Sequence, residues 1–387
     1  MPDATDEAQD SRRGPKPAQR GRVRARILDL VSSGALRPGQ ALPTEAALAA
    51  AFGASQPTVH RELKRLVADG VLAFDGEGRR ILADRRSGLL GRTVAMFTAY
   101  GMQPPGVSQR SEAWEASLEK LTWRALQRLG LFCWQLPAEA IGERELHLLD
   151  HDRPGVALVF GTSLPSPRCN AILAALAAAH VPTVVYGTQS APRTGDAIAS
   201  DHTAGGEMAC RWLATHGCQR LICQQSVGHP IGDWLDRRLR GAATAAEKAG
   251  LAEPGVLIQP PQISDANGEA VRYQAEVVLL TEALRSHVAG PLPLGILALS
   301  DGEVPRLWGA VRRLGLTPGR DVLVAGYDGY WADLVERVWE PTPPSVTVDK
   351  RHSEIADALA ATADRRLREP AAAPVRRLVE PMLIELR

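Results

Sequence analysis

Apolar residues near the start of the chain recur at helical spacing in three separate runs. The first run occupies residues 19–31, with apolar side chains at Val23, Ile27, Leu28, Leu30 and Val31. After a stretch rich in Gly and Pro, the second run extends from Thr44, a good N-cap residue, to about Phe52. Gly53 ends this run, and Ser55 begins the third. The pattern predicts three short helices.

The third helix is expected to bury one face and to expose polar side chains at its N-terminal end. Its apolar stripe consists of Val59, Leu63, Leu66 and Val67, and Pro57 lies in the first turn, where its missing N–H costs nothing. The other early positions are polar or basic: Gln56, Thr58, His60, Arg61 and Lys64. Two helices joined by a tight turn, with the second polar at its start, predict a helix-turn-helix that enters the major groove of DNA.

A β-hairpin is predicted directly after this helix. In "GVLAFDGEGRRILA" (70–83), two short strand patterns flank the turn at Asp75–Gly78, and Arg79 and Arg80 lie near its tip. A basic hairpin beside a recognition helix is typical of a winged helix, in which the hairpin follows the adjacent backbone or minor groove. The front of the chain is therefore predicted to bind double-stranded DNA.

The distribution of charge agrees with a nucleic-acid partner for the front alone. Residues 12–86 contain 15 Lys and Arg against 7 Asp and Glu, whereas residues 87–387 contain 30 against 33. The length of 387 residues predicts two or three domains. Residues 1–18 have no apolar core, so they are expected to form a disordered tail rather than a secretory signal.

Beyond a polar segment predicted to be a linker (84–91), strand patterns alternate with helical stretches. The strand patterns lie at 94–98, 131–135, 156–161, 181–187, 220–226, 294–301, 321–328 and 345–349. Continuous apolar strands in β-α alternation are typical of buried parallel sheet. Small and polar residues follow several strands, as in "IASD", "LALSD" and "AGYD", and ligands bind at the carboxyl ends of such strands. Two facing sheets would place these ends around one cleft.

Other kinds of chemistry have little support in the sequence. The five Cys residues are odd in number and lie mostly in apolar patterns, which favours reduced thiols in a cytoplasm. No apolar run reaches the ~18 residues of a membrane span. His216, Cys218, Cys223 and His229 do not suit a metal, because residues 218–223 span a turn and a strand with alternating side chains. No metal or other cofactor is expected, and hydrolase and phosphate-binding motifs are absent from the sequence.

The front of the chain resembles the winged helix of GntR-type bacterial transcription regulators over residues 19–83. The resemblance rests on "LPTEAALAAAFGASQPTVHRELKRLVADGVL" and "GEGRRIL", with Leu-Pro-[Ser/Thr]-Glu, Gly-x-Ser, Thr-Val and Leu-x-x-Gly in order. Three positions differ: the family usually has basic residues where this chain has Ala46, Gln56 and His60. Since Gln suits adenine and Arg suits guanine, we expect an operator different from the family's common one.

The resemblance implies roles for the polar side chains of this domain. Phosphate positioning is expected from Ser55 and Thr58, and phosphate or wing contacts from Lys64, Arg79 and Arg80. Gln56 and His60 are expected to read base edges, with a structural role for His60 as the alternative. Arg65 is expected to be solvated or paired with Asp69.

From about Arg92 to the end, the chain resembles the sensor domain of LacI/GalR-type repressors, which is similar to periplasmic sugar-binding proteins. The most specific segments are "IASDHTAGGEMACRWLATHGCQRLICQ", "DRRLRGAATAAEKAGL", "ILALSDGEVPRLWGAVRRLGLTPGRDVLVAGYDGYW" and "PPSVTVDKRHSEIADALAA". The resemblance implies an α/β effector-binding and dimerisation domain over 92–387. Its lobe 1 is expected at about 92–217 plus 343–370, and its lobe 2 at about 218–342 plus 371–387.

In that family the cleft between the lobes holds a small effector. The resemblance places Asp201, an Arg before Gly241 and Asp328 at ligand positions, where Asp and Arg suit hydroxyl-rich ligands. Arg237, Arg238 and Arg240 all precede that glycine, and Arg238 is favoured. The remaining candidates are Ser300, Asp301 and the aromatic residues Tyr100, Trp234 and Trp331, for which core packing is the alternative. The family's usual Asn-Asp is Ser300-Asp301 here, and its Asp-Asp is Asp328-Gly329, which favours an effector outside the family's familiar sugars.

The sequence as a whole predicts a multi-domain, cytoplasmic transcription regulator, most simply a repressor. Its expected partners are double-stranded operator DNA, a small-molecule effector, most simply a sugar or sugar derivative, and a second copy of the chain in a homodimer. Three alternatives stay open: a nucleoside-like effector, a sensor domain used only for dimerisation or protein docking, and an α/β carbohydrate-processing enzyme. The last needs a nucleophile or base that the sequence does not supply, so an enzyme is not expected.

Overall fold

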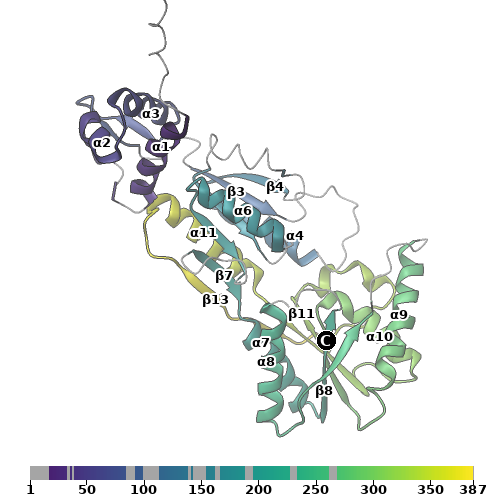
Figure 1. The fold of residues 1–387 in the computed structure, drawn as a ribbon. Helices are drawn as coiled ribbons and strands as arrows, with labels where there is room; N and C mark the ends of the chain where they lie inside the picture. The colour runs from purple at the N-terminus through teal and green to yellow at the C-terminus, as the bar shows by residue number, and fades with distance from the viewer. Residues whose placement is uncertain are drawn as a thin grey trace, which may run out of the picture.

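The computed structural model describes residues 17–32, 35–36, 39–83, 92–98, 113–137, 141–142, 154–161, 166–187, 195–226, 233–260 and 268–386. A small, mainly helical domain lies beside two α/β lobes, each built on a six-stranded sheet (Figure 1). The predicted fold class, a winged helix-turn-helix plus a two-lobed α/β domain, is confirmed. Among the described helices, none is long and apolar enough to cross a membrane.

The N-terminal domain packs three helices against a two-stranded hairpin. Its elements are α1 (Pro17–Ser32), α2 (Glu45–Phe52), α3 (Gln56–Ala68), β1 (Leu72–Phe74) and β2 (Arg80–Leu82). The strands pair antiparallel, as predicted for the wing. Thr44 caps α2, because its Oγ1 accepts a hydrogen bond from the Ala47 N–H. The apolar stripes of the three helices and the hairpin meet in one core.

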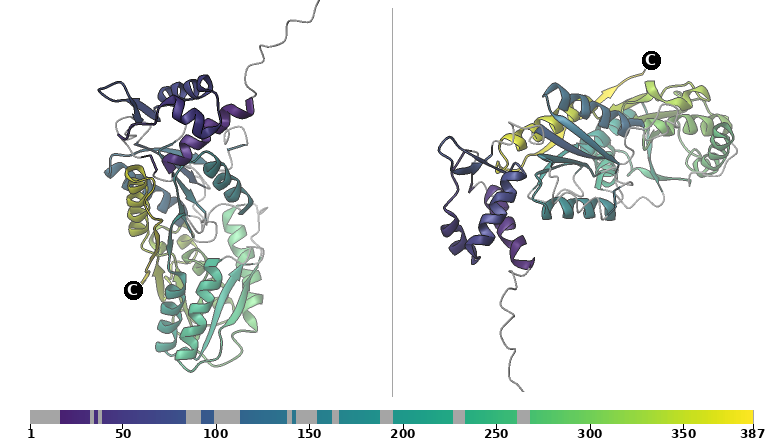
Figure 2. Two further views of the ribbon diagram at one scale, coloured as in Figure 1. Left: turned by 60° about the vertical axis from the view of Figure 1, so that its left-hand side comes forward. Right: turned by 90° about the horizontal axis from the view of Figure 1, so that it is seen from above.

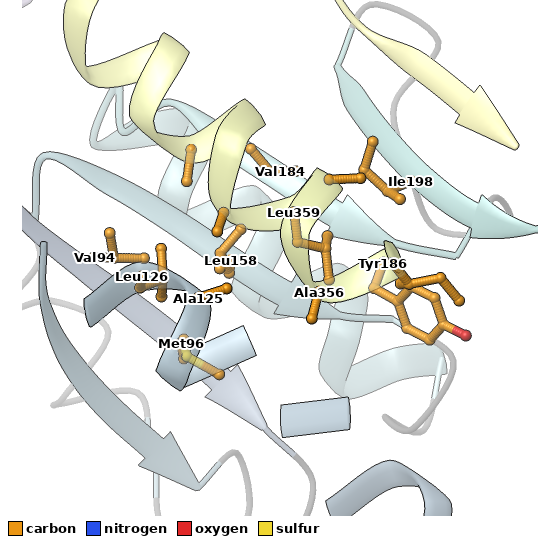
Figure 3. Close-up of a cluster of buried hydrophobic side chains, with 14 of the residues drawn as sticks. Val94, Met96, Ala125, Leu126, Leu158, Val184, Tyr186, Ile198, Ala356 and Leu359 are labelled. Carbon is orange, nitrogen blue, oxygen red and sulfur yellow. The ribbon is translucent and has the colours of Figure 1, made fainter. Parts of the chain in front are cut away.

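The first lobe contains a fully parallel sheet with the strand order β13-β7-β6-β5-β3-β4. Its elements are β3 (Thr93–Thr98), α4 (Ala113–Arg128), β4 (Phe132–Pro137), β5 (Val156–Phe160), α6 (Ser166–Ala178), β6 (Thr183–Tyr186), β7 (Asp196–Ser200), α11 (His352–Arg368) and β13 (Arg376–Val379). Strand β5 is buried at every position, because helices cover both faces of the sheet. Figure 3 shows one of these faces, where Leu158 and Val184 of the sheet pack against Leu359 of α11.

The second lobe has the strand order β14-β12-β11-β10-β8-β9, with only the end strand β14 antiparallel to its neighbour. Its strands are β8 (Arg220–Ser226), β9 (Gly255–Gln259), β10 (Leu294–Leu297), β11 (Val322–Tyr327), β12 (Val346–Asp349) and β14 (Met382–Ile384). Its helices are α7 (His202–Thr215), α8 (Asp233–Lys248), α9 (Glu269–Arg285) and α10 (Val304–Arg313), with short 3-10 turns η3 (Asp301–Glu303), η4 (Trp331–Asp333) and η5 (Val335–Val338). Separate apolar cores lie on the two faces of the sheet.

The lobe boundaries differ from those predicted at three segments. The prediction assigned 202–217 and 346–349 to lobe 1 and 376–379 to lobe 2. In the structure, α7 packs against α8 and the second sheet, and β12 pairs with β11, so both belong to the second lobe. Strand β13 pairs with β7 and belongs to the first lobe. The chain therefore passes between the lobes after β7, after β12 and after β13.

The winged helix lies against the first lobe through α1 (Figure 2). Asp29 of α1 and His180, which follows α6, approach to 3.3 Å between Oδ1 and Nε2. A crevice of about 370 Å³ separates the remaining surfaces of α1 and the first lobe. The predicted linker, 84–91, and most of the predicted tail lie outside the described residues, and α1 begins at Pro17, inside that tail.

Candidate functional site

The N-terminal turns of α3 expose the two residues predicted to read bases. Gln56 and His60 are exposed, whereas Val59 and Leu63 are buried in the core of the domain. Gly53 makes the turn before α3 possible, because it takes the left-handed conformation at φ 61° that ends α2. The helix thus presents a polar end at the surface, supported by an apolar stripe.

Thr58 does not lie on the exposed surface of α3. Its side chain is buried, and its Oγ1 lies 2.8 Å from the Oγ of Ser55, which is exposed. The helical turn directs Thr58 toward the domain interior next to Val59. A phosphate could therefore reach the Ser55 hydroxyl directly, but Thr58 only through Ser55, which corrects the direct contact predicted for Thr58.

One carboxylate joins the recognition helix to the wing. Oε1 of Glu45, in the first turn of α2, lies 3.0 Å from His60 Nδ1 and 2.5 Å from Arg80 Nη1. Burial raises the pKa of Glu45, but the hydrogen bonds from His60 and Arg80 outweigh it and leave this pKa below its ordinary value. The guanidinium of Arg80 also lies over the ring of Phe74, at 5.6 Å. Glu45 was not among the predicted site residues, because in the sequence it is simply an acidic residue in the first turn of a helix.

The other basic side chains are exposed at the same end of the domain. Arg79 of the wing pairs with Asp75, at 2.8 Å, and with Glu77, at 3.1 Å. Lys64 is exposed on α3. Arg65 is exposed, which agrees with the solvated alternative of its prediction, and it pairs with Glu62 at 2.8 Å rather than with Asp69. The exposed pairs of Arg79 contribute little to stability, so they can exchange for phosphates at small cost.

A buried charged cluster lies at the carboxyl ends of the strands of the second lobe. Asp328 follows β11, Lys350 follows β12, and Arg238 reaches them from α8. Oδ1 of Asp328 lies 2.8 Å from Lys350 Nζ and 3.4 Å from Arg238 Nη2. The exposed fractions are 3% for Asp328, 1% for Lys350 and 4% for Arg238. Two buried cations thus share one carboxylate oxygen.

Neutral groups hold the rest of the Arg238 guanidinium. Its Nε donates to His202 Nδ1 at 3.3 Å, and its Nη1 donates to the Leu299 carbonyl at 2.6 Å. The guanidinium lies over the rings of Tyr327, at 3.4 Å, and Trp234, at 4.6 Å. Burial, followed by the charges of nearby cations including Arg238 and Lys350, holds the pKa of His202 well below its ordinary value. His202 therefore accepts this hydrogen bond as a neutral ring.

The candidate arginines before Gly241 differ in burial. Arg238 is buried, Arg237 is half-buried and Arg240 is exposed. The guanidinium of Arg238 lies within the charged cluster around Asp328. The position of α8 in the structure thus places Arg238 in the cluster, whereas the sequence alone left three arginines as candidates.

Asp301 and Trp331 are structural rather than part of the charged cluster. Oδ2 of Asp301 accepts hydrogen bonds from the N–H groups of Tyr330 and Trp331, at 2.8 and 3.0 Å, and Oδ1 accepts one from Thr347 Oγ1 at 2.7 Å. Trp331 packs in an apolar core of the second lobe. Ser300 is also buried, and its Oγ lies 3.3 Å from the Tyr330 hydroxyl. Asp301 and Trp331 thus support the loop after β11, and the effector contacts predicted for them stay predictions.

Asp201 lies at the start of α7, beside the cluster. Its Oδ1 accepts a hydrogen bond from the Ala204 N–H at 3.0 Å, so it caps this helix, and its side chain is half-buried. Helix capping thus occupies only one of its carboxylate oxygens in the contacts described. Tyr100, also predicted to contact the effector, lies outside the described residues, as does His229.

Two family patterns match the chain. That of the bacterial regulatory proteins of the gntR family matches residues 19–81, and that of the periplasmic binding protein-like domain matches residues 210–386. The chain joins a GntR-type winged helix to a periplasmic-binding-protein-like domain. Both domains predicted from the sequence are therefore confirmed.

Curated relatives match the two domains separately. The GntR-type domain is 40% identical over 73 residues to the mannosyl-D-glycerate transport/metabolism system repressor of Escherichia coli, a match that spans 19% of this chain and 30% of that repressor. Another region is 25% identical over 207 residues to the ribose operon repressor of Escherichia coli, and covers 53% of this chain and 57% of that repressor. The chain thus spans about a third to just over half of the length of these relatives.

Solved structures share the fold. The transcriptional regulator CelR in complex with cellobiose has a TM-score of 0.58 and 18% identity, with 89% of this chain and 98% of that chain covered. A LacI family regulator from Enterococcus faecium with bound ribose has a TM-score of 0.56 and 16% identity, with 76% and 97% covered. At these identities the likeness shows the fold of the periplasmic-binding-protein-like domain.

Three members of the charged cluster in this domain were not among the predicted site residues. Lys350 could have been found, because it directly follows the strand pattern "SVTVD", where the strand-end rule applies. The same rule marks the segments of the other two, because His202 directly follows "IASD" and Tyr327 lies within "AGYD", but it does not indicate which side chains of these segments join the cluster. The hydroxyl of Tyr327 and Nδ1 of His202 lie 3.4 Å apart because α7 packs against β11.

No group of three or more His, Cys, Asp or Glu side chains in the described parts of the two domains is arranged to hold a metal. The three cysteines of α7 and β8 and the turn between them, Cys210, Cys218 and Cys223, are free thiols in an apolar core. Burial raises the pKa of Cys218 to about 12, so this thiol stays protonated and unreactive at neutral pH.

Proposed function

We propose that this protein is a transcription regulator, acting as a repressor, whose affinity for operator DNA is controlled by a small molecule bound at the Arg238–Asp328 cluster. The observation that carries the proposal is the combination in one chain of an exposed polar recognition helix and a buried polar cluster at the strand ends of a periplasmic-binding-protein-like lobe. Because its target would be chromosomal DNA, the protein would work in the cytoplasm.

The GntR-type domain is the part proposed to bind DNA. Gln56 and His60 would read base edges from the major groove, and Ser55, Lys64, Arg79 and Arg80 would contact the backbone. Glu45 would hold His60 and Arg80 until DNA is bound. Support comes from the exposure of these side chains, except for the half-buried Arg80, and from the GntR relatives, which are named as repressors.

The second lobe is proposed to bind a sugar or sugar derivative. Arg238, Asp328 and Asp201 offer donors and acceptors for hydroxyl groups, and the ring of Trp234, half-buried beside Arg238, offers an apolar face. The matching regulators are named for ribose or hold cellobiose and ribose. We further infer that the cluster binds rather than converts its ligand, because Arg238 and Lys350 occupy the carboxylate of Asp328, the residue best placed to act as a base.

A homodimer is proposed to bring two winged helices onto a two-fold operator. Exposed apolar side chains gather at corresponding edges of the two sheets. In the first lobe they lie on α4, on β4 and in the turn between them: Trp123, Leu129, Phe132 and Trp134. In the second lobe they lie on β9 and α9: Val256, Ile258, Val271, Val278 and Leu279. Patches of this kind on edge strands usually pack against a partner. Hinge motion of the lobes in such a dimer would change the spacing of the winged helices.

The test begins with DNA. Selection of bound duplexes from a random pool by the full chain should return a two-fold symmetric site, and fluorescence anisotropy should then give its affinity. Adding a panel of sugars, sugar derivatives and nucleosides should change that affinity for at least one compound, because linkage between two sites is reciprocal. Equal operator affinity with and without a compound that demonstrably binds the chain would remove the proposed control, and a panel without any binder would favour the docking alternative.

A further inference from the structure

The imidazole of His60 is bound to protein through one of its two nitrogens. Nδ1 lies 3.0 Å from Oε1 and 3.2 Å from Oε2 of Glu45. The side chain of His60 is 53% exposed, and within the part of the chain that the structure describes Nε2 has no hydrogen-bond partner. Gln56 and His60 lie four residues apart on α3, so they share one face of the helix. Nε2 is therefore the ring atom that His60 offers to DNA.

The carboxylate of Glu45 can only accept the hydrogen bond from His60. Burial raises the pKa of Glu45, but the hydrogen bonds from His60 and Arg80 lower it further, so Glu45 is ionised at neutral pH. An ionised carboxylate has no proton to donate. The hydrogen atom between Glu45 and His60 therefore belongs to Nδ1.

Arg80 supplies the positive charge that pairs with Glu45. Its Nη1 lies 2.5 Å from Oε1 of Glu45. Because these two groups already balance each other in charge, the contact with His60 does not require a positively charged imidazole. A neutral imidazole carries a single N–H, which here is Nδ1–H, so Nε2 keeps a free lone pair and can only accept a hydrogen bond.

Backbone contacts fix Glu45 in this position. The N–H of Leu42, just before α2, donates to the Arg80 carbonyl of the wing at 2.8 Å. Leu48 of α2 is buried in the core that the helices and the wing share. The start of α2 is thus held against both the wing and α3, so Glu45 sets the state of the His60 ring before any DNA is bound.

We propose that Glu45 makes His60 a hydrogen-bond acceptor toward DNA, so that His60 reads the exocyclic amino group of an adenine or a cytosine in the major groove. In that groove adenine N6 and cytosine N4 are donors, whereas guanine N7 and O6 and thymine O4 are acceptors. A ring nitrogen that can only accept would bind neither a guanine or thymine edge nor a phosphate oxygen. The inference rests on the proposed DNA binding by α3 and extends it, because the contact between Glu45 and His60 is kept in the complex.

The first experiment finds the base pair that His60 contacts. Duplexes bound by the full chain and by His60→Ala are selected from a random pool at pH 8. A position with a base preference in the first selection but not in the second is assigned to His60. Every base pair carries one amino group in the major groove, so the selected sequence locates the contact but does not yet reveal its chemistry.

Base analogues then reveal which atom is read. At the assigned pair, adenine is replaced by purine or cytosine by 2-pyrimidinone, each of which lacks the exocyclic amino group. His60→Ala is titrated on the same duplexes, so that any weakening of the base pair itself cancels. Removal of the amino group should cost the unmodified chain about three- to tenfold more affinity than it costs His60→Ala. Replacement of the purine N7 by carbon should affect both proteins equally, and a larger loss for the unmodified chain there would make His60 a donor and overturn the proposal.

Two matched substitutions test Glu45 as a positioning residue. Glu45→Gln places an amide beside Nδ1, which can donate as well as accept and so no longer fixes the ring proton. The extra affinity lost with the amino group should then largely disappear. Glu77→Gln makes the same change at an exposed carboxylate of the wing that pairs with Arg79, and should leave this loss unaltered. Equal effects of the two substitutions would contradict the role of Glu45.

The position of the ring proton can be observed without DNA and without a variant of Glu45. In the full chain labelled with ¹⁵N-histidine, the ring signals that vanish in His60→Gln belong to His60. At pH 8 they should show a proton on Nδ1 and none on Nε2. A proton on Nε2, in a neutral or in a doubly protonated ring, would overturn the proposal even if Glu45→Gln fails to fold.

The outcomes separate this inference from the proposed function. If a site is selected but removal of the amino group costs the unmodified chain no more than His60→Ala, readout by His60 as an acceptor is overturned while operator binding stands. If the full chain selects no duplex, DNA binding by α3 is contradicted, and the inference falls with it.

Discussion

The guanidinium of Arg238 and the carboxylate of Asp328 meet at 3.4 Å, although 90 positions separate the two residues in the chain. The contact joins α8 to the loop after β11 at the carboxyl end of the second sheet. Lys350 binds the same carboxylate oxygen from the loop after β12, where the chain returns to the first lobe. Three segments thus converge on one oxygen atom, and the segment after β12 continues into the first lobe, so a ligand that changed this contact would change the relation between the lobes.

Replacement of Asp328 by Asn should abolish the response of the protein to its effector. The change leaves Arg238 and Lys350 buried without their carboxylate, a situation that costs about 3–5 kcal/mol of folding free energy. Denaturant unfolding should show this loss, and calorimetry should show that effector binding is lost. Operator affinity without effector should remain, because the winged helix has a separate core. Asp321→Asn, which breaks an exposed pair with Arg320, is the control, and an equal loss there would contradict the assignment.

Gln56 and Lys64 should differ in what they contribute to DNA binding. Gln56→Ala should cost about 1–3 kcal/mol on the operator and little on unrelated DNA, because a base contact carries sequence information. Lys64→Gln should weaken binding to both and reduce the salt dependence by about one counterion. Anisotropy titrations over a range of salt concentrations measure both quantities. Equal weakening of specific and unrelated DNA by Gln56→Ala would exclude it from base readout.

Glu45→Gln should reduce the specificity of DNA binding. The carboxylate holds His60 and Arg80 in place, and it also repels the phosphate backbone. Its loss should free both basic side chains and strengthen binding to unrelated DNA, while operator affinity gains less or falls. The quantity to measure is the ratio of the two affinities. Asp69→Asn, which breaks the pair with Arg24, serves as the matched change, and an equal shift in ratio there would argue against a specific role for Glu45.

Buried histidines should make the protein less stable in acid. Burial is the main cause of the low pKa of His202 and His352, which for His352 is about 3 against an ordinary 6.5. Between the native and the ordinary pKa of these histidines, the unfolded chain binds more protons than the native protein. The contribution of the neutral histidines to folding stability is therefore complete above about pH 6.5 and is lost as the pH falls. Asp301 acts in the opposite sense, because its pKa is raised from 3.8 to about 7 and its contribution is lost as the pH rises.

Because the buried histidines and Asp301 change folding stability with pH in opposite directions, their substitutions should have opposite effects. Asp301→Asn should make the loss of stability on acidification from pH 6.5 to about 4 steeper, because the opposing group is gone. His352→Gln should make it shallower, because one proton fewer is taken up on unfolding. Urea unfolding at several pH values measures both slopes. Unchanged slopes in both variants would show that neither residue titrates differently in the two states.

Substitution in the exposed edge of the first lobe should disrupt the proposed dimer. Trp134 is 39% exposed on the edge strand β4, and Trp134→Asp places a charge in its apolar patch. Size-exclusion chromatography with light scattering should show a monomer, and affinity for a two-fold operator should fall. Val338→Asp, at a residue that is 75% exposed on η5, should remain dimeric. A wild-type chain that is monomeric at micromolar concentration would contradict the dimer itself.

The sequence by itself determined the elements whose signals are local. Helical spacing, Thr44 as a cap and Gly53 in the left-handed region define the winged helix, because these choices depend on neighbours a few residues away. Eight strands of the two sheets followed from continuous apolar runs for the same reason. Strands β9, β13 and β14 were not predicted, because they lie at the ends of the sheets and are partly exposed, so they carry no continuous apolar run. The resemblance to known families then pointed to Arg238 on α8 and to Asp328 directly after β11. These two residues lie in one site.

Only the tertiary structure decided which polar side chains share that site and which support the fold. Asp301 and Asp328 both follow apolar strands, yet their carboxylates have different partners. That of Asp301 accepts hydrogen bonds from backbone N–H groups, whereas that of Asp328 contacts two cations. Lys350 and His202 join the cluster because sheet order and the packing of α7 bring their segments together, and no local pattern encodes contacts over such separations. The same physics placed α7 and β12 in the second lobe, because strand pairing and helix packing, rather than order along the chain, define a lobe.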